Sequence, residues 1–476
     1  MDNITRSPGI LSVQSEFIPV INPATGEKIG AIPRGTAADV DAAVIRASAT
    51  FPSWAAKDPA DRGKILYNAA ALVRTRQIEL SRLLTSEQGK PLKESANEIA
   101  GFARTLEYYA SISGGMRGDY SHSSLYGHAM VSWKPLGVCG AIIPWNVPAI
   151  IMGWKVGPVL ASGNALILKP ASTAPLTCIA LASCLTDAGL PPELLQIVPG
   201  PGEVVGEAIA AHPDIRAVSF TGEITTGRRV ASLAAPQFKR LTLELGGSDP
   251  MIVCKDADLT GAAKGAVAGR FYNCGQTCTA VKRLFVDEEI ENEFTGKLLT
   301  LIEDLKVGNG LSPGVDIGPV HTNLQRSRLI SQIERTVDAG YGTLRAGGKK
   351  PETSELTKGS FFEPTLLTEV DPRAPVLQEE VFGPVLPVLS YHSIDDAISA
   401  SNNTPFGLGA SVWTHDSRII SRVCTELQAG IVWINQHLKI PPEVPFGGVK
   451  QSGIGRENGR YALEHYLEEK TILIRP

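Results

Sequence analysis

Two hydrophobic periodicities divide the chain into regions. From about residue 37 to residue 114, apolar residues recur at the spacing of amphipathic helices. Ahead of that region, the apolar runs 17–21 and 28–32 flank the turn-forming sequence Asn22-Pro23-Ala24-Thr25-Gly26 and predict two short strands. The chain therefore opens with a strand pair that is followed by a set of helices.

From residue 138 the rhythm changes to short, apolar strands that alternate with helical segments. The predicted strands are 138–143, 165–168, 194–198 and 217–220, and the predicted helices are 149–162, 174–188, 203–211 and 224–233. Fully apolar strands in alternation with helices are typical of a parallel sheet that helices cover on both faces. This part of the chain is therefore predicted to be a doubly wound α/β domain.

Two further units are predicted from the remaining pattern. A second αβ region begins at residues 241–247, where Gly246-Gly247 marks a domain junction, and runs to about residue 450. Residues 114–127 are rich in Gly, Ser and Tyr and lead into an alternating segment, which together predict a β-hairpin arm. The last strand is predicted at 471–474, where it can pair with another element or another subunit.

Composition excludes several classes of protein. The 476 residues carry 45 Lys and Arg against 49 Asp and Glu, a net charge of -4, which excludes a strongly basic nucleic-acid-binding protein. No apolar run reaches the length of about 18 residues that a membrane span needs, and the N-terminal sequence lacks the apolar core of a signal peptide. We therefore expect neither a nucleic acid nor a membrane as partner.

The cysteines are distributed as in a protein of a reducing compartment, and the histidines show no metal-binding pattern. The seven cysteines are scattered and form no CxxC pair, so a disulfide framework is not expected and a cytoplasmic location is. The eight histidines show no HxxxH spacing beside a carboxylate, so no metal site is expected.

Three residues could carry chemistry. Cys278 ends the turn sequence 273–278 between a predicted helix and a predicted strand, where a thiol can face a cleft as a nucleophile. Glu244 interrupts an apolar strand just before two glycines, where a general base is one reading and a hydrogen-bonded structural carboxylate is the other. Asn146 follows an apolar strand between two prolines, as an oxyanion donor or a turn residue. Taken alone, Cys278 is equally a small buried hydrophobe.

Other motifs also lie where strands end and helices begin. They are Leu168–Ser172, Ser219–Glu223 and the glycines of 200–206. Such positions suit the phosphates of a dinucleotide, although no GxGxxG sequence is present.

In their order and spacing these motifs resemble the aldehyde dehydrogenase superfamily, from about Val20 to the C-terminus. The matching segments are Asn22–Gly26, Pro144–Asn146, Glu244–Gly247, Gly275–Cys278, Glu380–Pro384, Pro445–Gly448 and Ser452-Gly453. The resemblance implies an α/β fold with a Rossmann-like NAD(P)-binding domain of parallel strands (1–113 and 136–246) and an α/β catalytic domain (247–451). A small β oligomerisation arm and C-terminal segment (114–135 and 452–476) would complete it, so a homodimer or homotetramer is expected.

The resemblance also assigns catalytic roles. Cys278 would attack the aldehyde to form a thiohemiacetal and then a thioester, with Asn146 and the backbone N–H of Cys278 as the oxyanion hole. Glu244 would activate the hydrolytic water, and Lys155 and Glu457 would relay protons. Cys274 is interpreted as a packing residue.

The cofactor site that the resemblance implies is NADP or NAD. Lys169 and Ser172 would meet the adenosine ribose, the helix that starts at Glu223 would face the pyrophosphate, and Glu380 and Phe382 would hold the nicotinamide ribose and ring. The further cofactor positions are Ile142, Pro144, Trp145, Gly202, Gly206, Phe220, Gly222 and Leu245. NAD-preferring relatives commonly carry Glu where this chain has Ser172, so NADP is favoured. Many relatives have Ser where this chain has Glu223, and a carboxylate beside pyrophosphate must turn away.

The substrate is expected to be an apolar or aromatic aldehyde. The positions that match the substrate tunnel of the family are Gly101, Val147, Ile151, Trp154, Thr277, Ile440 and Phe446. Relatives that oxidise succinate semialdehyde often have Arg where this chain has Trp154. The alternatives are a semialdehyde-specific or CoA-acylating enzyme of the same fold, and a non-catalytic structural homologue.

Overall fold

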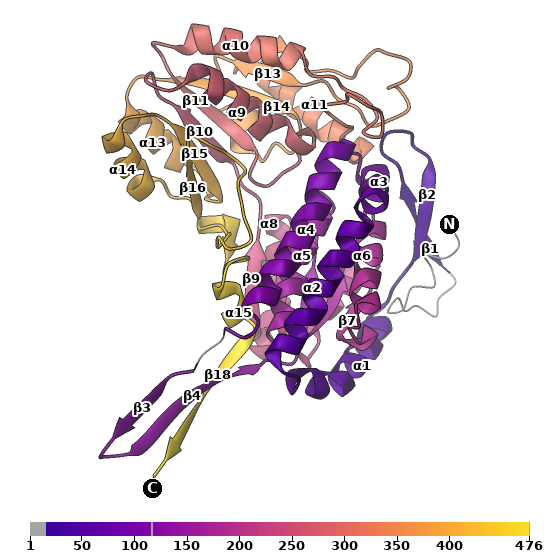
Figure 1. The fold of residues 1–476 in the computed structure, drawn as a ribbon. Helices are drawn as coiled ribbons and strands as arrows, with labels where there is room; N and C mark the ends of the chain where they lie inside the picture. Colours follow the sequence, from indigo (N-terminus) through magenta and orange to yellow (C-terminus); the bar gives the residue numbers. More distant parts are fainter. Residues whose placement is uncertain (1–15, 116–117, 476) are drawn as a thin grey trace.

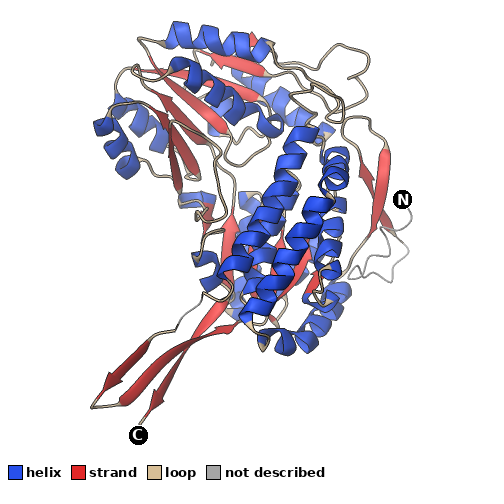
Figure 2. Ribbon diagram, viewed as in Figure 1, coloured by secondary structure: helices blue, strands red, loops and turns tan. Residues whose placement is uncertain are grey.

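The fold was analysed in a computed structural model, which describes residues 16–115 and 118–475. Two α/β bodies lie one above the other, and a slender β arm projects away from the lower body (Figures 1 and 2). The lower body, the arm and the upper body have separate sheets, and the two bodies have separate hydrophobic cores.

The N-terminal region forms the strand pair and the helices that its periodicity predicts. Strands β1 (Phe17–Ile21) and β2 (Lys28–Pro33) pair antiparallel. The helices that follow are α1 (Ala37–Ala55), α2 (Pro59–Thr75), α3 (Gln77–Gln88) and α4 (Leu92–Ile112). Thr36 starts α1 in a capping box with Asp39, and Gly89, with φ of 106°, ends α3 in the left-handed conformation that glycine adopts at little cost.

The first large sheet contains the predicted doubly wound strands in the order β17-β9-β8-β5-β6-β7. Its strands are β5 (Val138–Ile142), β6 (Ala165–Lys169), β7 (Leu195–Ile197), β8 (Ile215–Thr221), β9 (Arg240–Glu244) and β17 (Gly453–Ile454), all parallel except β17. The helices between them are α5 (Pro148–Ala161), α6 (Leu176–Asp187), α7 (Glu207–Ala211) and α8 (Ile224–Ala234). Because β8 returns beside β5 after β6 and β7 have extended the other side, a switch point lies between β5 and β8. Ligands of such sheets bind at that point, beyond the carboxyl ends of the strands.

The second large sheet has the order β12-β13-β14-β11-β10-β15-β16, and only β12 runs antiparallel to its neighbour. Its strands are β10 (Asp249–Val253), β11 (Val281–Asp287), β12 (Thr343–Ala346), β13 (Thr365–Thr368), β14 (Val385–Tyr391), β15 (Gly409–Trp413) and β16 (Ile431–Ile434). The helices around it are α9 (Leu259–Phe271), α10 (Glu291–Glu303), α11 (Asn323–Asp338), α12 (Pro375–Gln378), α13 (Ile394–Asn402) and α14 (Ser417–Glu426).

Three details differ from the sequence expectations. Strand β9 belongs to the first sheet, so the second αβ region starts with β10 at Asp249 and not at residue 241. The two-residue strand β17 pairs with β9, and Tyr466 packs in the first core, so part of the C-terminal segment belongs to the lower body. A strand this short leaves no periodicity to detect. The segment Gly202–Gly206 is a π-helical turn ahead of α7, where an α-helix is predicted from residue 203.

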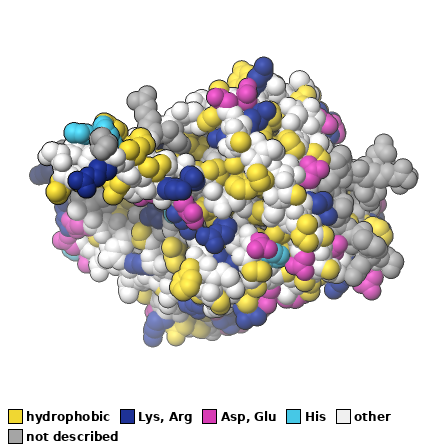
Figure 3. All heavy atoms as spheres, turned by 90° about the horizontal axis from the view of Figure 1, so that it is seen from below, with side chains coloured by type: hydrophobic (Ala, Val, Ile, Leu, Met, Phe, Trp, Pro, Cys, Tyr) yellow, Lys and Arg dark blue, Asp and Glu magenta, His cyan; other side chains and the backbone are white. Residues whose placement is uncertain are grey.

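The arm is a three-stranded antiparallel sheet built from two distant parts of the chain. Strands β3 (Tyr120–Ser123) and β4 (Gly127–Pro135) form the predicted hairpin, and β18 (Leu467–Ile474) pairs along β4 after the short helix α15 (Tyr461–Glu464). Seen from below, hydrophobic side chains lie on the arm beside charged ones (Figure 3). Leu125 at the hairpin tip is 85% exposed and Leu473 on β18 is 64% exposed, so this sheet has apolar surface that the chain itself does not cover.

Some features are absent from the described part of the chain. Within residues 16–115 and 118–475, no helix is long and apolar enough to cross a membrane. The same residues contain no group of three or more His, Cys, Asp or Glu that could hold a metal ion. All seven cysteines are in described segments, and each is a free thiol.

Candidate active site

Cys278 lies on an irregular loop between α9 and β11. Within this loop Asn273 and Cys274 adopt left-handed backbone conformations, with φ of 52° and 55°, and Gly275 follows with φ of 71°. A left-handed residue other than glycine costs about 1–3 kcal/mol, and the cost persists only where surrounding contacts hold the backbone in place. The loop therefore depends on groups outside itself.

Buried side chains supply those contacts. The Glu94 carboxylate accepts a hydrogen bond from the Asn273 N–H at 2.9 Å. The Asn273 amide donates to the carbonyls of Asn146 (2.8 Å) and Gln276 (3.1 Å). The Gln276 side chain donates to the Asn273 carbonyl at 3.0 Å and accepts from the His321 N–H at 2.8 Å. Helix α4, the turn after β5 and the segment at residue 321 thus fix the shape of the loop.

The two thiols of the loop differ in access. Cys278 is half-buried, whereas Cys274 is buried in the hydrophobic core of the second body, as its interpretation as a packing residue requires. Burial raises the pKa of Cys278 to about 12, and the charge of the nearby Lys282 opposes that rise. Cys278 is therefore the thiol of this loop that can reach a ligand, and it needs a base or a positive charge to become a thiolate.

Asn146 points at the same loop from the first sheet. It follows β5, and its side-chain amide donates to the Gln276 carbonyl at 3.0 Å, two residues before Cys278. Its own carbonyl accepts from the Lys90 ammonium at 2.7 Å. The Asn146 amide is thus held beside the nucleophile loop, where a neutral donor can stabilise an oxyanion.

A buried ion pair supports Asn146. The ammonium of Lys90 pairs with the carboxylate of Glu98, and both side chains are 0% exposed. The other oxygen of Glu98 accepts from the Ala149 N–H at 2.8 Å, at the start of α5. Glu94, one helical turn before Glu98 on α4, is also buried, and burial raises its pKa to about 8.

Sequence reasoning missed Lys90, Glu94 and Glu98. A signal was present, because the two carboxylates fall on the face of α4 that also carries Phe102 and Leu106. Carboxylates on the apolar face of a helix are rarely buried without a partner or a function.

Glu244 is the last residue of β9 and lies at the carboxyl edge of the first sheet. It is 3% exposed, and neither of its carboxyl oxygens has a hydrogen-bond partner within the described chain. Burial, followed by the charge of Glu457, raises its pKa well above the ordinary range, while Lys155 and Arg456 oppose the rise. A carboxyl group in this state can accept a proton from a water molecule once it ionises.

Lys155 and Glu457 meet as the resemblance implies. The Lys155 ammonium donates to Glu457 Oε1 at 2.8 Å and to Ser219 Oγ at 2.7 Å, and Ser219 Oγ donates to the same oxygen at 2.6 Å. Ser219, on β8, is a member of this buried cluster that sequence reasoning placed only as part of a strand-end motif. The charge of Glu457 acts on Glu244, so the cluster is electrostatically coupled to the candidate base.

The predicted cofactor residues gather at one edge of the first sheet. Ile142 ends β5 and Pro144 and Trp145 follow it, Phe220 lies near the end of β8 and Gly222 follows that strand, and Leu245 follows β9. Lys169 ends β6 and donates to the Pro170 carbonyl at 3.1 Å. Ser172 donates to the Gly200 carbonyl at 2.7 Å, so its hydroxyl faces the Gly200–Gly206 segment that holds Gly202 and Gly206. Burial lowers the pKa of Lys169 to about 8, and the charge of Glu203 opposes that change.

Glu223 turns away from the start of α8. Its exposed carboxylate lies 3.7 Å from the Arg328 guanidinium, and it makes no side-chain bond to the helix that it precedes. The backbone N–H groups of the first turn of α8 therefore stay open to an anion, which is the arrangement a pyrophosphate needs.

Glu380 and Phe382 reach the same edge from the second body. Oε1 of Glu380 accepts from the Lys282 ammonium at 2.8 Å and from the Gly247 N–H at 3.2 Å. The ring of Phe382 meets Trp145 edge-on at 5.6 Å between centroids, and Trp145 stacks on His321 at 4.4 Å. Glu380 thus touches the junction between the two bodies.

Two of the predicted substrate residues form an aromatic pair. The rings of Trp154 and Phe446 lie 5.1 Å apart between centroids. Gly101 faces Ile150, and a Cβ at that glycine would come within 2.7 Å of the isoleucine side chain. Ile151, Val147 and Ile440 belong to or pack against the same core, and Thr277 precedes the nucleophile. Their role as tunnel walls stays a prediction.

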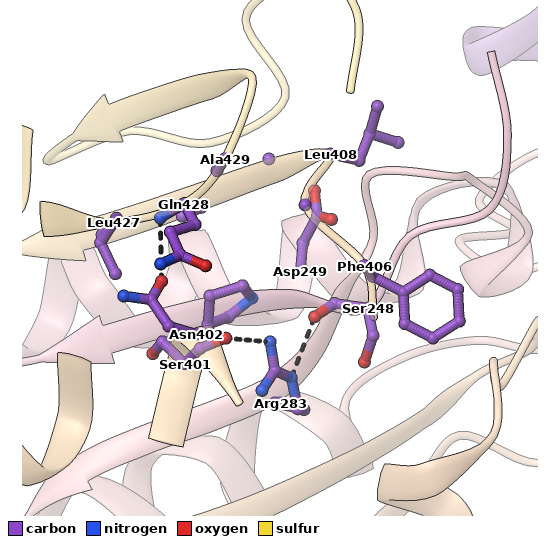
Figure 4. A pocket seen from close by; sticks show the side chains of 14 residues that line it. Ser248, Asp249, Arg283, Ser401, Asn402, Phe406, Leu408, Leu427, Gln428 and Ala429 are labelled. Carbon is purple, nitrogen blue, oxygen red and sulfur yellow. Dashed lines mark hydrogen bonds between the residues drawn. The ribbon is translucent and has the colours of Figure 1, made fainter. Parts of the chain in front are cut away.

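A separate cavity lies at the start of the second sheet (Figure 4). Its lining includes Asp249, Arg283 and Phe406, and Arg283 donates to the carbonyls of Ser248 and Ser401, both at 2.9 Å. Burial raises the pKa of Asp249 to about 7. Cys278 is not among the lining residues, so this cavity is distinct from the candidate active site.

Known proteins resemble the chain over almost its whole length. The profile of the aldehyde dehydrogenase family matches residues 10–472. A betaine aldehyde dehydrogenase of Cereibacter sphaeroides is 40% identical over 460 residues, 96% of this chain and 93% of the relative. An NADP-dependent enzyme of E. coli superposes with a TM-score of 0.95 and 37% identity, over 100% of this chain and 99% of that one. A betaine aldehyde dehydrogenase of Staphylococcus aureus solved with NAD+ superposes with a TM-score of 0.94 and 34% identity, over 97% and 92%.

Replacing one partner of the buried ion pair should destabilise the fold strongly. Lys90→Met leaves the Glu98 carboxylate buried without its counter-charge, and we expect a loss of about 3–5 kcal/mol in the free energy of unfolding. Denaturant unfolding of wild type and variant measures it. The double variant Lys90→Met/Glu98→Gln should recover most of the loss, because a neutral amide can still accept from Ala149. If the single variant unfolds at the wild-type midpoint, the pair is not buried in solution.

Proposed function

Since the chain belongs to the aldehyde dehydrogenase family, we propose that it oxidises an aldehyde to the carboxylic acid through a thiohemiacetal and a thioester on Cys278. The proposal rests on one arrangement. Cys278 is half-buried, the Asn146 amide is bonded to the same loop, and the charge of Glu244, whose carboxyl has no hydrogen-bond partner in the described chain, acts on the Cys278 thiol.

The first half of the reaction uses the nucleophile and the oxyanion donors. After its thiol proton has passed to a base or to solvent, the thiolate of Cys278 attacks the aldehyde carbon, and the electron pair of the carbonyl bond moves to its oxygen. The Asn146 amide and the backbone N–H of Cys278 donate hydrogen bonds to that oxygen, which carries the developing charge. A nicotinamide dinucleotide, when bound, supplies the hydride acceptor, and loss of the hydride leaves a thioester on Cys278.

The second half uses the buried carboxyl. Glu244 takes a proton from a water molecule that attacks the thioester carbon, and the acid and the Cys278 thiolate are released. The raised pKa of Glu244 makes it a stronger base once ionised, and the charges of Glu457 and Lys155 act on it in opposite directions. The presence of this carboxyl argues against the CoA-acylating alternative, in which no water needs to be activated.

The dinucleotide is proposed to bind at the carboxyl edge of the first sheet. Lys169 and Ser172 would hold the adenosine ribose, the first turn of α8 would take the pyrophosphate, and Oε2 of Glu380, which accepts no bond within the described chain, is open to the nicotinamide ribose. We favour NADP because the ammonium of Lys169 can donate to a 2′-phosphate, and the neutral hydroxyl of Ser172 can do so by rotating away from the Gly200 carbonyl. The relatives divide on this point, since one is described as NADP-dependent and another was solved with NAD+.

The aldehyde is proposed to lie against Trp154 and Phe446. This pair suits an apolar or aromatic body, which is the expectation from the sequence. It also suits a quaternary ammonium group, because such cations bind the faces of aromatic rings. The relatives named betaine aldehyde dehydrogenases favour the second candidate, an aldehyde with a cationic head group.

The arm is proposed to contact a second copy of the chain. Its apolar surface around Leu125 and Leu473 is exposed in one copy, and burial against another would remove it from water. A homodimer or homotetramer is the expected assembly.

The function is tested by aldehyde-dependent reduction of the dinucleotide. Wild type should turn over, whereas Cys278→Ala should lose turnover by a factor of about 10⁴ or more because no covalent intermediate can form. Cys274→Ala is the matched control and should keep most of its activity. Comparing kcat/KM for benzaldehyde, betaine aldehyde and succinate semialdehyde identifies the substrate class. A wild type that binds the dinucleotide but oxidises none of them would support the non-catalytic alternative.

Glu244→Gln should separate the two halves of the reaction. The amide cannot take a proton from water, so the first turnover should give a burst of reduced dinucleotide and the second should stall. In wild type, steady-state turnover should rise with pH as Glu244 loses its proton, because the raised pKa keeps it protonated at lower pH. The variant should lose this dependence. Equal loss of the burst and of the steady state would mean that Glu244 activates the thiol instead.

Ser172→Glu should shift cofactor use toward NAD. A carboxylate accepts from both ribose hydroxyls of NAD and repels a 2′-phosphate, which together amount to about 2–3 kcal/mol, or roughly a hundredfold in specificity. The ratio of kcat/KM for NADP+ to that for NAD+ in wild type and variant measures the change. An NAD-specific wild type with an unchanged variant would show that Ser172 does not face the 2′ position.

A further inference from the structure

Lys282 lies where the nucleophile, the nicotinamide-ribose carboxylate and the inter-body junction meet. It is the second residue of β11, four positions after Cys278, and its side chain is 1% exposed. Neither its position in a strand nor the motif that carries Cys278 marks it in the sequence. A buried lysine is costly unless its three N–H donors are paired.

All three donors are used, and each goes to a different part of the site. The ammonium donates to the carbonyl of Cys278 at 2.7 Å, to the carbonyl of Gly247 at 2.7 Å and to Oε1 of Glu380 at 2.8 Å. It also lies 5.7 Å from the centroid of the Phe382 ring. One charged group therefore ties the loop of the nucleophile to the segment after Glu244 and to both residues expected at the nicotinamide.

The contact to Glu380 leaves one carboxylate oxygen for a ligand. Oε1 accepts from Lys282 and from the Gly247 N–H, whereas Oε2 lies beside Gly246, where a Cβ would come within 2.2 Å of it. Without the ammonium, Glu380 would lose its charged partner and its fixed orientation. Because Oε1 of the Glu380 carboxylate is held by hydrogen bonds, the orientation of Oε2 is fixed, and Oε2 can accept from the ribose hydroxyls.

The hydrogen bond to the Cys278 carbonyl places a positive charge beside the residue that carries the sulfur. Among the charges that act on this thiol, Lys282 favours the thiolate, whereas Asp249, Glu244 and Glu380 disfavour it. The effect of Lys282 on the pKa of the thiol is thus opposite to that of three carboxylates. This effect is independent of the backbone bond that it makes to the same residue.

We propose that Lys282 is a positioning residue that orients Glu380 for the nicotinamide ribose and supplies the positive charge that favours the Cys278 thiolate. The proposal rests on the proposed function of Cys278 and Glu380. It adds a single group that couples dinucleotide binding to the reactivity of the nucleophile, because Glu380 and Cys278 share the same ammonium.

Two readouts test the proposal in the full-length protein. In Lys282→Met, the dissociation constants of NADP+ and NAD+ by calorimetry should rise by about tenfold to a hundredfold, as expected for the loss of a charge-assisted hydrogen bond. The rate at which iodoacetamide alkylates Cys278, followed on that peptide by mass spectrometry, should fall at neutral pH by about tenfold, with its pH profile displaced to higher pH. Lys297→Met, a lysine on α10 that pairs only with Glu293, is the matched control and should change neither.

Further variants separate positioning from folding. Lys282→Gln keeps N–H donors but no charge, so it should retain more of the dinucleotide affinity than Lys282→Met and show the same displaced alkylation profile. In a Glu380→Ala background, Lys282→Met should no longer weaken dinucleotide binding but should still slow alkylation. A Lys282→Met protein with wild-type affinity and alkylation overturns the proposal, as does an affinity loss that persists undiminished without Glu380. If Cys278→Ala itself turns over aldehyde, the proposed function fails instead, so the two failures are distinguishable.

Discussion

The loop that carries Cys278 has no regular secondary structure of its own, and the site depends on how its backbone is held. Two of its residues are left-handed without being glycine, and its polar backbone groups are bonded by side chains from other segments. Glu94 on α4 and Asn146 after β5 come from the first body, and Lys282 on β11 comes from the second. The loop is thus fixed only when both bodies are in place. A nucleophile held in this way stays rigid without a helix or a strand to carry it.

The segment between β9 and β10 joins the two sheets beside the candidate active site. The carboxyl ends of β5, β6, β8 and β9 form the edge of the first sheet at which the dinucleotide is proposed to bind, and the segment after β9 crosses directly to β10 in the second. Glu380 reaches back to that crossing through the Gly247 N–H, and Ser452 fixes it from the other side by donating to the Gly246 carbonyl at 2.7 Å. The glycines at 246 and 247 are needed there because side chains would collide with Glu380 and with the Cys278 carbonyl. The segment that joins the two bodies therefore also lies against the candidate active site.

Burial decides the resting charge of the site. It raises the pKa of the Cys278 thiol and of the Glu244 carboxyl, so both groups favour their neutral forms before substrate arrives. Two buried lysines lower these pKa values. Lys155 lowers the pKa of Glu244 against the effect of its ion-pair partner Glu457, and Lys282 lowers the pKa of Cys278 against the effect of its ion-pair partner Glu380. The candidate base and the candidate nucleophile therefore have similar surroundings, because the charges of a buried lysine–glutamate pair act on each of them.

The sequence by itself determined strands β5, β6, β7 and β8 of the first sheet, the hairpin arm and the family, because wholly apolar strands and ordered motifs are properties of local sequence. It also identified Cys278, Glu244 and Asn146 as candidates, since each interrupts its surroundings with a chemically distinct group. The placement of β9 in the first sheet and the pairing of β17 were decided only by tertiary structure, because strand partners far apart in the chain leave no local trace. The same holds for Lys90, Glu94, Glu98 and Lys282. Lys90 and Lys282 look like ordinary charged residues in the sequence, and the one trace of Glu94 and Glu98 there is their place on the apolar face of α4. The partners of all four are set by the tertiary structure.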